Sequence, residues 1–554
     1  MNQKAFAGLL AAASLISIQV AQGSEPLLTR HVRDVQSGEA RVAGQLPATQ
    51  ILQLDVVLPL RDQAGLDAFV AALYAEPAHD RHYLTPAEFT ERFGPTQQDY
   101  DAVVQYLEGH GLSVVGGSRD GMDVQVQGPV YAVEGAFHLS MLTYQLPSEN
   151  RTFFAPDREP TTDLSFALWH VSGLDNYSIP HPRYVSRTAY AAEHGLDART
   201  LVDHATTGSG PSASFLGSDM RAAYYGGSLT GAGQNLGLLE YYGTDLADLT
   251  TYFKNAGQTN NVPITLLSTD GTSTSCVYSS GCDDTEQTID MTQAIGMAPG
   301  LASLTMYIGS TDTAIISAMT THSPLPTTIG CSWGWTPADP STLNPYWEKM
   351  AAQGQNFFAA SGDDSTWSRR NEAWPADAAY VISVGGTDLT TSSAAGPWAS
   401  ETAWADSGGG ISPDKIAIPS WQAQAGVINS SNKGSTKYRN GPDVSANANF
   451  TFYVCADQTT CTANEYGGTS FATPMWAAYV ALANQQLAAD GYSTLGFLNP
   501  YLYGFGLSSS YDTDFHDITS GRSGSYSAVK GYDLVTGWGS PNGQALINAL
   551  VGED

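Results

Sequence analysis

From about residue 232 onward, short apolar runs alternate with stretches that have a helical period. The apolar runs are bounded by Gly, Asp or Ser and show little polar alternation, which is typical of strands buried on both faces of a parallel sheet. We therefore predict an α/β domain with a central, mostly parallel sheet, whose functional residues lie at the carboxyl ends of the strands. The strands are expected within residues 234–242, 303–309, 327–334, 355–362 and 378–387, with helices such as 313–322 and 345–354 between them.

The region before this domain has a different pattern. Residues from about 48 to 145 combine amphipathic helical stretches with strand-like runs, which predicts a compact α+β domain with an antiparallel sheet. Its strands are expected at 51–60, 112–117, 122–128 and 141–146, and its helices at 62–74, 85–94 and 97–111. Residues 146–215 are richer in Pro, Ser, Thr and Asp and show little periodicity, so we interpret them as a linker.

The chain begins with Lys4 in a short basic start, followed by an apolar run and then small residues before Ser24. This order predicts a cleaved export signal over residues 1–23 and a secreted protein. A membrane anchor is the alternative, but the apolar run is shorter than the roughly 20 residues that a spanning helix needs.

The chain is strongly acidic, with 54 acidic and 24 basic residues and a net charge of −30. This balance argues against nucleic acid and against anionic membrane surfaces as partners. Only 14% of the residues are charged, so acidification would add little positive self-repulsion. The composition therefore suits acidic surroundings, although solubility alone would explain it equally well.

All five cysteines follow residue 275. Cys276 and Cys282 flank one short stretch and Cys455 and Cys461 another, so each pair could close a small disulfide loop in an oxidising compartment. Cys331 is left over, and its apolar surroundings predict a buried structural thiol rather than a nucleophile.

Ser470 lies in "EYGGTSFATPMWAA", behind two glycines and at the start of a predicted helix. It is a candidate nucleophile, although serine is also common at helix starts because its oxygen caps free N–H groups. A conventional serine hydrolase needs a histidine base. Only His322 and His516 follow residue 205, so the sequence offers few candidates for the base of a histidine-based triad.

Two carboxylates offer another base. Glu286 and Asp290 are four residues apart in a helical run and therefore share one face. On the surface, the repulsion between two such carboxylates is weak and indicates no function. If the pair is buried, it can hold one proton between two carboxyls and accept a proton from serine in acid. Asp363 follows an apolar strand; it either caps the next turn or, if protonated, donates to an oxyanion.

Several motifs occur together in the order of one family: "EQTID" followed by "QAIGMAPG", then "SGD", then "GGTSFATP". Supporting motifs are "SWG", "VGGT", "ETAW", "GGGIS" and "GPDVSANAN". In these motifs the chain resembles the sedolisin family of serine-carboxyl peptidases, and the region holding "YLTPAEFTERFG" resembles the pro-kumamolisin-like propeptide of that family. The resemblance implies a subtilisin-like α/β domain preceded by a ferredoxin-like α+β propeptide domain with an antiparallel sheet.

The resemblance also implies the roles of four residues. Ser470 corresponds to the nucleophile, Glu286 to the general base and acid, and Asp290 to the partner that orients Glu286. Asp363 corresponds to the donor that stabilises the oxyanion together with the Ser470 backbone N–H. Gly467 stands where the family usually has serine, which we interpret as a conservative change in a tight turn.

The motifs "FHDITSG" and "VKGYDLVTGWGSPNG" resemble the calcium site of the same family. The resemblance implies one structural Ca²⁺, bound only by oxygen atoms as a hard cation requires. The carboxylates come from Asp517 and Asp533, and the carbonyl oxygens come from Ile518, Val529 and Gly531. Without the resemblance, these aspartates would read as ordinary loop caps.

We accordingly predict three segments: a signal peptide at 1–23, a propeptide at 24–205 and a peptidase domain at 206–554. The expected protein is a secreted, autoprocessed endopeptidase that acts on proteins in acid, is inhibited by its own propeptide and is monomeric when mature. A tripeptidyl-peptidase of the same family is the near alternative. A calcium-stabilised binding protein without turnover is the alternative from another class.

Overall fold

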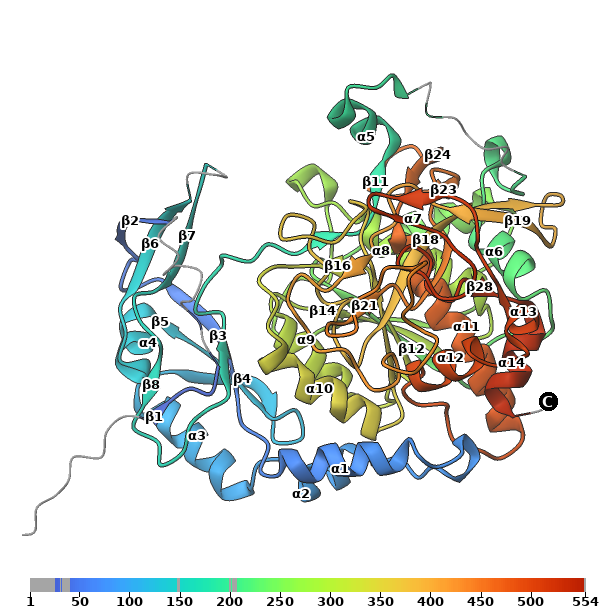
Figure 1. Cartoon of the computed structure of the whole chain (residues 1–554). Helices are drawn as coiled ribbons and strands as arrows, with labels where there is room; N and C mark the ends of the chain where they lie inside the picture. The colour runs from blue at the N-terminus through green and yellow to red at the C-terminus, as the bar shows by residue number, and fades with distance from the viewer. Residues whose placement is uncertain are drawn as a thin grey trace, which may run out of the picture.

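The centre of the computed structural model is an eight-stranded sheet with the order β13-β14-β12-β15-β17-β18-β19, in which β22 also pairs with β18 (Figure 1). Every pairing is parallel except β18 with β19, so the predicted mostly parallel sheet is confirmed. The strands are β12 (Asn235–Glu240), β13 (Ile264–Ser268), β14 (Ser303–Ile308), β15 (Thr328–Cys331), β17 (Asn356–Ala360), β18 (Ile382–Thr391), β19 (Trp398–Ala403) and β22 (Val444–Asn447).

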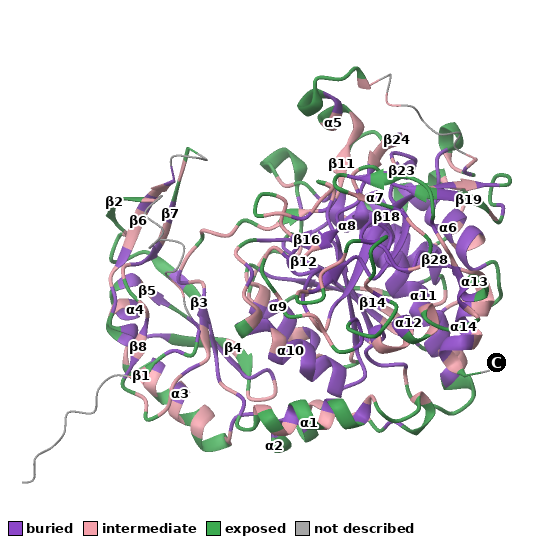
Figure 2. Ribbon diagram, viewed as in Figure 1, coloured by how far each residue is buried: buried purple, intermediate pink, exposed green. Residues whose placement is uncertain are grey.

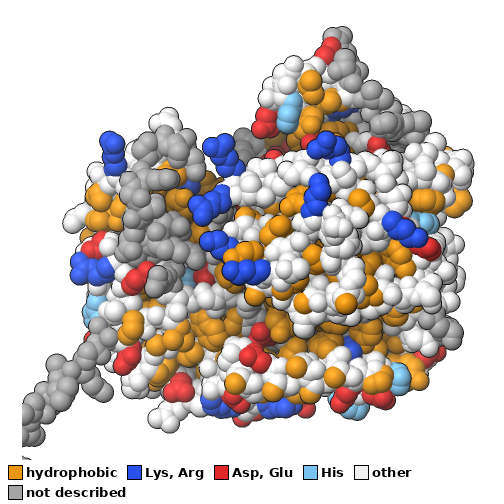
Figure 3. Space-filling view, viewed as in Figure 1, with side chains coloured by type: hydrophobic (Ala, Val, Ile, Leu, Met, Phe, Trp, Pro, Cys, Tyr) orange, Lys and Arg blue, Asp and Glu red, His pale blue; other side chains and the backbone are white. Residues whose placement is uncertain are grey.

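The structure describes residues 25–29, 31, 40–146, 150–198, 201 and 207–552, so the predicted export signal, residues 1–23, lies outside the described residues. Within the described ranges, no helix is both long and apolar enough to span a bilayer. On the face shown in Figure 3, charged side chains are sparse, as the low charged fraction requires.

Helix α11 (Thr469–Ala489) runs through the middle of the large domain (Figure 2). It contains no charged residue and packs against β15, β17, β18 and α8, because a helix that is apolar all round must be buried. The other helices of this domain are α6 (Gly217–Tyr224), α7 (Leu246–Asn255), α8 (Thr285–Met297), α9 (Asp312–Met319), α10 (Pro340–Ala352), α12 (Asn499–Gly506), α13 (Tyr511–Asp514) and α14 (Gly543–Val551).

The smaller domain contains a four-stranded antiparallel sheet with the order β4-β5-β3-β9. This order, with helices between the first and second strands and between the third and fourth, is the ferredoxin-like arrangement that we expected. The elements are β3 (Ile51–Val57), α1 (Gln63–Leu73), α2 (Pro86–Arg92), α3 (Gln97–Gly109), β4 (Ser113–Ser118), β5 (Asp123–Pro129), α4 (Val130–Phe137) and β9 (His170–Ser172).

The folded part of the small domain extends beyond the predicted 48–145. The predicted strand 141–146 is β6 (Met141–Leu146), but it belongs to a separate three-stranded sheet with β2 (Arg41–Gln45) and β7 (Arg151–Pro156). Both β7 and β9 come from the segment that we interpreted as a linker. A strand as short as β9 offers too few residues to show alternation, so the sequence gives no sign of it.

The two domains pack against each other through α1 and α10 (Figure 1). Leu66, Val70, Phe89 and Phe93 of the small domain belong to the same apolar cluster as the core of the large domain. Beyond β9, the chain crosses the large domain as β10 (His181–Pro182), β11 (Val185–Ser186) and α5 (Arg187–His194).

Short strands and two disulfides hold the loops of the large domain. Both expected pairs, Cys276–Cys282 and Cys455–Cys461, are bonded, and Cys331 is a buried free thiol in β15. The remaining strands of this domain are β16 (Trp333–Gly334), β20 (Gly410–Ile411), β21 (Asn440–Gly441), β23 (Phe452–Val454), β24 (Thr462–Gly467), β25 (Phe515–His516), β26 (Arg522–Ser523), β27 (Tyr526–Ser527) and β28 (Ser540–Pro541). In the N-terminal region, β1 (Glu25–Pro26) pairs with β8 (Thr161–Thr162).

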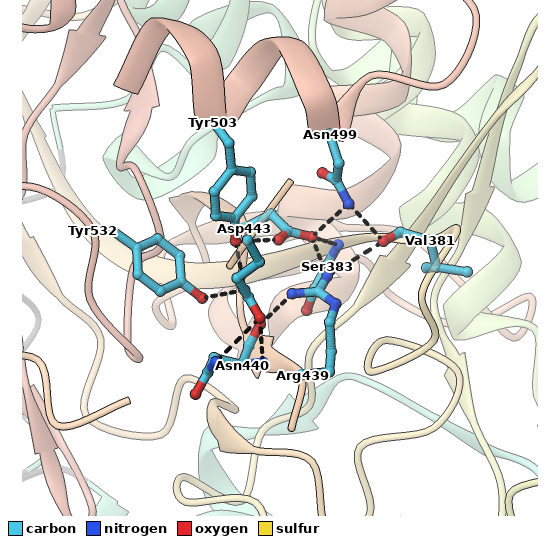
Figure 4. Close-up of polar contacts among 9 residues, drawn as sticks. Val381, Ser383, Arg439, Asn440, Asp443, Asn499, Tyr503 and Tyr532 are labelled. Carbon is cyan, nitrogen blue, oxygen red and sulfur yellow. Dashed lines mark hydrogen bonds and ion pairs between the residues drawn. The ribbon is translucent and has the colours of Figure 1, made fainter. Parts of the chain in front are cut away.

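A buried ion pair joins Arg439 to Asp443 of the "GPDVSANAN" motif (Figure 4). Both side chains are fully buried. Asp443 also accepts hydrogen bonds from the Ser383 backbone N–H at 2.8 Å and from the Tyr503 hydroxyl at 2.7 Å. The motif therefore has a structural role: it ties β22 to β18 and α12, and removal of one charge would cost about 3–5 kcal/mol.

Candidate active site

Ser470 lies in the first turn of α11 and is fully buried. Its Oγ donates a hydrogen bond to Glu286 Oε2 at 2.8 Å, and its backbone N–H donates to the carbonyl oxygen of Arg183 at 2.9 Å. Gly468 precedes the helix with φ 141°, a conformation that favours glycine. A Cβ on Gly467 would lie 2.7 Å from the carbonyl oxygen of Ala448, so a serine at this position would need a local shift.

Glu286 and Asp290 project from α8, a helix in which all 13 residues are buried. Asp290 Oδ1 accepts a hydrogen bond from Ser332 Oγ at 2.6 Å, and Asp290 also lies within hydrogen-bonding reach of the Glu286 carboxyl. Burial, followed by the charge of Asp290, raises the pKa of Glu286 well above its usual range, and burial also raises the pKa of Asp290. The pair can therefore retain a proton between two carboxyls.

A third carboxyl, Glu240, extends this pair. It ends strand β12, is fully buried, and accepts a hydrogen bond from Trp333 Nε1 at 3.0 Å. Burial and the nearby charge of Asp290 raise its pKa well above the usual range, and its own charge adds to the raised pKa of Glu286. We did not identify Glu240 from the sequence; the available sign was an acid at the carboxyl end of a buried strand.

Asp363 follows β17 and is held by Thr469, whose backbone N–H and Oγ1 donate to Asp363 Oδ1 at 2.8 and 2.9 Å. Burial raises the pKa of Asp363 to about 8. Its Oδ2 makes no hydrogen bond among the described residues. A Cβ on Gly468 would lie 2.7 Å from this Oδ2 and 2.4 Å from the carbonyl oxygen of Arg183, so both oxygens face the same small space.

The structure thus brings together Glu286, Asp290, Asp363 and Ser470, the four residues predicted for the site. The two histidines lie elsewhere. His322 faces Tyr307, with Nδ1 3.4 Å from the phenol oxygen, and the His516 ring stacks on Trp398 at 4.0 Å between ring centroids. Within the described part of the chain, neither imidazole contacts Ser470, so the geometry gives no support to a histidine base.

The predicted calcium ligands gather around one loop. Asp533 accepts from the backbone N–H of Val529 at 3.0 Å, and Asp517 accepts from that of Gly531 at 3.2 Å. Burial raises the pKa of Asp533 to about 7, and no Lys or Arg among the described residues forms an ion pair with either aspartate. The carbonyl oxygen of Ile518 completes the predicted set.

This donor set fits a hard cation in that it offers only oxygen atoms. Asp533 is buried without an ion pair among the described residues, and its carboxylate also accepts hydrogen bonds from the backbone N–H groups of Val535 and Thr536, as a loop cap would. In the described ranges, no group of three or more His, Cys, Asp or Glu side chains is arranged to hold a metal ion. That finding does not exclude the predicted site, because the site uses only two carboxylates and its other ligands are carbonyl oxygens.

Comparison with known proteins agrees with both domains. Residues 39–177 match the pro-kumamolisin activation domain, and residues 285–495 match the subtilase family. Kumamolisin from Bacillus sp. (strain MN-32) is 30% identical over 562 residues, covering 95% of this chain and 98% of that protein. Tripeptidyl-peptidase sed5 from Aspergillus fumigatus is 23% identical, covering 90% of this chain and 93% of that protein.

Among solved structures, Pseudomonas sedolisin, a serine-carboxyl proteinase complexed with two molecules of pseudo-iodotyrostatin, matches with a TM-score of 0.50 and 27% identity. The match covers 61% of this chain and 96% of that structure, which agrees with an additional N-terminal region here. The chain therefore belongs to the sedolisin family of serine-carboxyl peptidases and is a serine-type peptidase with an activation domain.

Proposed function

We propose that this protein is a secreted serine-carboxyl endopeptidase that acts in acid and processes its own precursor. The observation that carries the proposal is the 2.8 Å hydrogen bond from Ser470 Oγ to Glu286, whose carboxyl is buried next to Asp290. A carboxylate is a useful base in acid, where a histidine would already be protonated.

In the first half of the reaction, Ser470 Oγ attacks the carbonyl carbon of the substrate while Glu286 takes the hydroxyl proton. The negative charge that develops on the carbonyl oxygen is stabilised by the Ser470 N–H and by the proton on Asp363 Oδ2. Glu286 then gives its proton to the leaving amine, which breaks the peptide bond and leaves an acyl ester on Ser470. Water repeats the sequence in the second half, with Glu286 again acting as base and then as acid.

Asp290 positions Glu286 and shares its proton. The expected dependence on pH follows from these protons. At neutral and higher pH, the carboxyls of Glu286 and Asp290 lose their shared proton, and Asp363 loses its own as the pH passes its pKa of about 8. In strong acid the base itself becomes protonated. Activity should therefore peak in acid.

Export is supported by the pattern of residues 1–23 and by the two disulfides, which are typical of oxidising compartments. We propose 24–205 as the propeptide and 206–554 as the peptidase domain. Self-inhibition is supported by β10 and β11, which lie on either side of Ser470 as antiparallel partners of β16 and β24. A single Ca²⁺ is proposed between Asp517 and Asp533, with carbonyl oxygens of Ile518, Val529 and Gly531.

Endopeptidase activity is our first candidate because the site accommodates an internal stretch of chain. Residues 180–186 pass Ser470 without an end, and the described chain continues upstream into β9. Any precursor that cleaves itself is continuous at this point, so the lengths of the products from a long peptide decide between the two activities. Release of tripeptides remains the second candidate because of the likeness to tripeptidyl-peptidase sed5.

The test is digestion of a denatured protein at pH 4 by the purified, acid-treated chain, with a Ser470→Ala precursor as control. We expect internal cleavage products from the wild type and none from the variant. Wild-type precursor that stays intact and digests nothing in acid would contradict the proposal. A Ser470→Ala precursor that shortens alone at the wild-type rate would contradict self-processing.

A further inference from the structure

The segment that crosses the active site is held at Arg183 by two backbone hydrogen bonds. The Arg183 N–H donates to the carbonyl oxygen of Ser332 at 2.8 Å, and the Arg183 carbonyl oxygen accepts from the Ser470 N–H at 2.9 Å. Residues on either side continue this alignment, since His181 pairs with Gly334 and Val185 pairs with Gly467.

This arrangement selects one peptide bond. The carbonyl oxygen that contacts both the nucleophile's own N–H and the space beside Asp363 Oδ2 is the one that would carry the oxyanion charge. It belongs to Arg183, so the bond presented for attack is Arg183–Tyr184. Tyr184 is the first residue on the carboxyl side of this bond. Its ring packs edge-on against Tyr466, and its hydroxyl donates to Asp283 at 3.2 Å.

The Arg183 side chain is also bound. It is 4% exposed, and its Nη2 lies 3.2 Å from the carbonyl oxygen and 3.3 Å from Oε1 of Glu372. Two glycines form the walls of the slot. A Cβ on Gly334 would lie 1.8 Å from Nη2, and a Cβ on Gly362 would lie 3.3 Å from Nη1. A side chain at Gly334 would therefore exclude the guanidinium.

We propose that Glu372 makes this peptidase cleave after arginine, with the bare backbone at Gly334 and Gly362 leaving room for the guanidinium. The inference rests on the proposed function above and names its substrate class: polypeptides with arginine on the amino side of the cleaved bond. Self-processing is the first such cleavage, between Arg183 and Tyr184. The position lies within the proposed propeptide segment 24–205, so this first cut would leave residues 184–205 attached to the peptidase domain.

The contacts with Glu372 identify a slot for a cationic side chain. Glu372 presents both a main-chain carbonyl and a carboxylate oxygen to Nη2 of the planar guanidinium. Glu372 also faces His181, with Nε2 3.9 Å from Oε1, two residues before Arg183. A purely structural ion pair would fix the propeptide in place but would have no effect on peptides added to the mature enzyme.

The first experiment uses the mature enzyme and three peptides. They differ only at the residue on the amino side of the cleaved bond, which is arginine, citrulline or leucine. Citrulline keeps the shape of arginine and lacks the charge. We expect kcat/KM for the arginine peptide to exceed that for the citrulline peptide by about 10- to 100-fold, the range for a hydrogen bond between charged groups. Glu372→Gln should remove most of this difference.

The matched control is Asp490→Asn, which removes one negative charge from the exposed far end of α11, about 30 Å along the helix from Ser470. It should keep the full preference for arginine. Equal cleavage of the arginine and citrulline peptides by the wild type, or an unchanged preference in Glu372→Gln, overturns the inference while leaving the peptidase proposal intact. Cleavage of no peptide and no denatured protein by the wild type overturns both.

The second experiment follows the precursor in acid. The new N-terminus should be Tyr184, and both Arg183→Gln and Glu372→Gln should slow its appearance. If the two side chains act through their mutual contact, the double variant should be slowed little more than either single variant. A first cut at another bond, or rate effects of the two changes that simply multiply, overturns the assignment.

Discussion

Ser470 Oγ donates to Glu286 Oε2 at 2.8 Å, although 184 residues separate the two in the sequence. The contact exists because α8 and α11 pack against each other in the core of the large domain. Burial that raises the pKa of Glu286 is also what would make this carboxyl basic enough to take a proton from serine. The same burial excludes water from the base.

We expect Glu286→Gln to lower kcat by about 10²- to 10⁴-fold, because the amide keeps the shape of the side chain but cannot accept the serine proton. Assays in acid with a chromogenic peptide would measure the loss. His322→Ala is the control and should retain nearly full activity, since His322 contacts Tyr307 and not Ser470. Full activity in Glu286→Gln together with loss in His322→Ala would restore the histidine-based mechanism.

We expect Asp363→Asn to reduce kcat/KM by roughly 10²- to 10³-fold, the range for loss of one oxyanion donor. The amide can still donate, but Thr469 binds the same carboxyl group through two hydrogen bonds, so the asparagine need not present its nitrogen to the substrate. The variant should also lose any alkaline limb near pH 8 that belongs to Asp363. An unchanged rate constant would exclude Asp363 as a donor.

Glu240→Gln should move the pH profile toward lower pH. The negative charge of Glu240 adds to the raised pKa of Glu286, so its removal lowers that pKa and the base stays ionised further into acid. We expect a smaller fall in kcat than for Glu286→Gln, because Glu240 contacts Asp290 and Trp333 rather than the substrate. A profile that keeps its acid limb in place while kcat falls would assign Glu240 a purely structural role.

The sequence predicted the parts of this molecule that repeat a pattern or a motif. Buried parallel strands appear as apolar runs, and Glu286, Asp290, Asp363 and Ser470 lie in motifs with a recognisable order. Strand β9 is too short to show a period. Glu240 was not identified, because it lies at the end of a strand and in none of these motifs. Glu372 could not be found, because its partner Arg183 lies 189 residues away and only the fold brings them together.

Chelation of calcium should lower the melting temperature of the mature enzyme more than its kcat. The proposed ligands Asp517 and Asp533 lie on a loop that shares no contact with Ser470 among the described residues. A ligand that binds only the folded state at a hundredfold excess over its Kd stabilises it by about 2.7 kcal/mol. Asp533→Asn should lower the melting temperature and abolish the response to chelator. An equal response in wild type and variant, with no calcium by elemental analysis, would exclude the site.

The precursor should be more stable at pH 4 than at pH 7.5, and the Ser470→Ala variant allows this measurement without self-cleavage. Burial raises the pKa of Asp363 from 3.8 to about 8, and burial likewise raises the pKa values of Glu240 and Asp377. Between the unfolded and the folded pKa, such a carboxyl binds more protons in the folded chain, so the free energy of unfolding falls as the pH rises through that window. Each unit of difference corresponds to about 1.4 kcal/mol.

Fewer groups oppose this trend. Lowered pKa values, which favour neutral pH, are found for Glu88 and Asp157 on the surface and for His516, whose pKa burial lowers to about 4. His516 therefore costs stability as the pH falls from its unfolded pKa towards 4, and we expect the several buried carboxyls with raised pKa values to outweigh this single group. Burial lowers the pKa of Lys349 to about 7. Lys349 therefore lowers the free energy of unfolding as the pH falls from its unfolded pKa to about 7, and this effect stays constant in acid. Adding Asp363→Asn to the Ser470→Ala precursor should flatten the pH dependence, because an amide does not titrate. Thermal unfolding at half-unit steps from pH 4 to pH 8 would test this, and a melting temperature that rises with pH would contradict it.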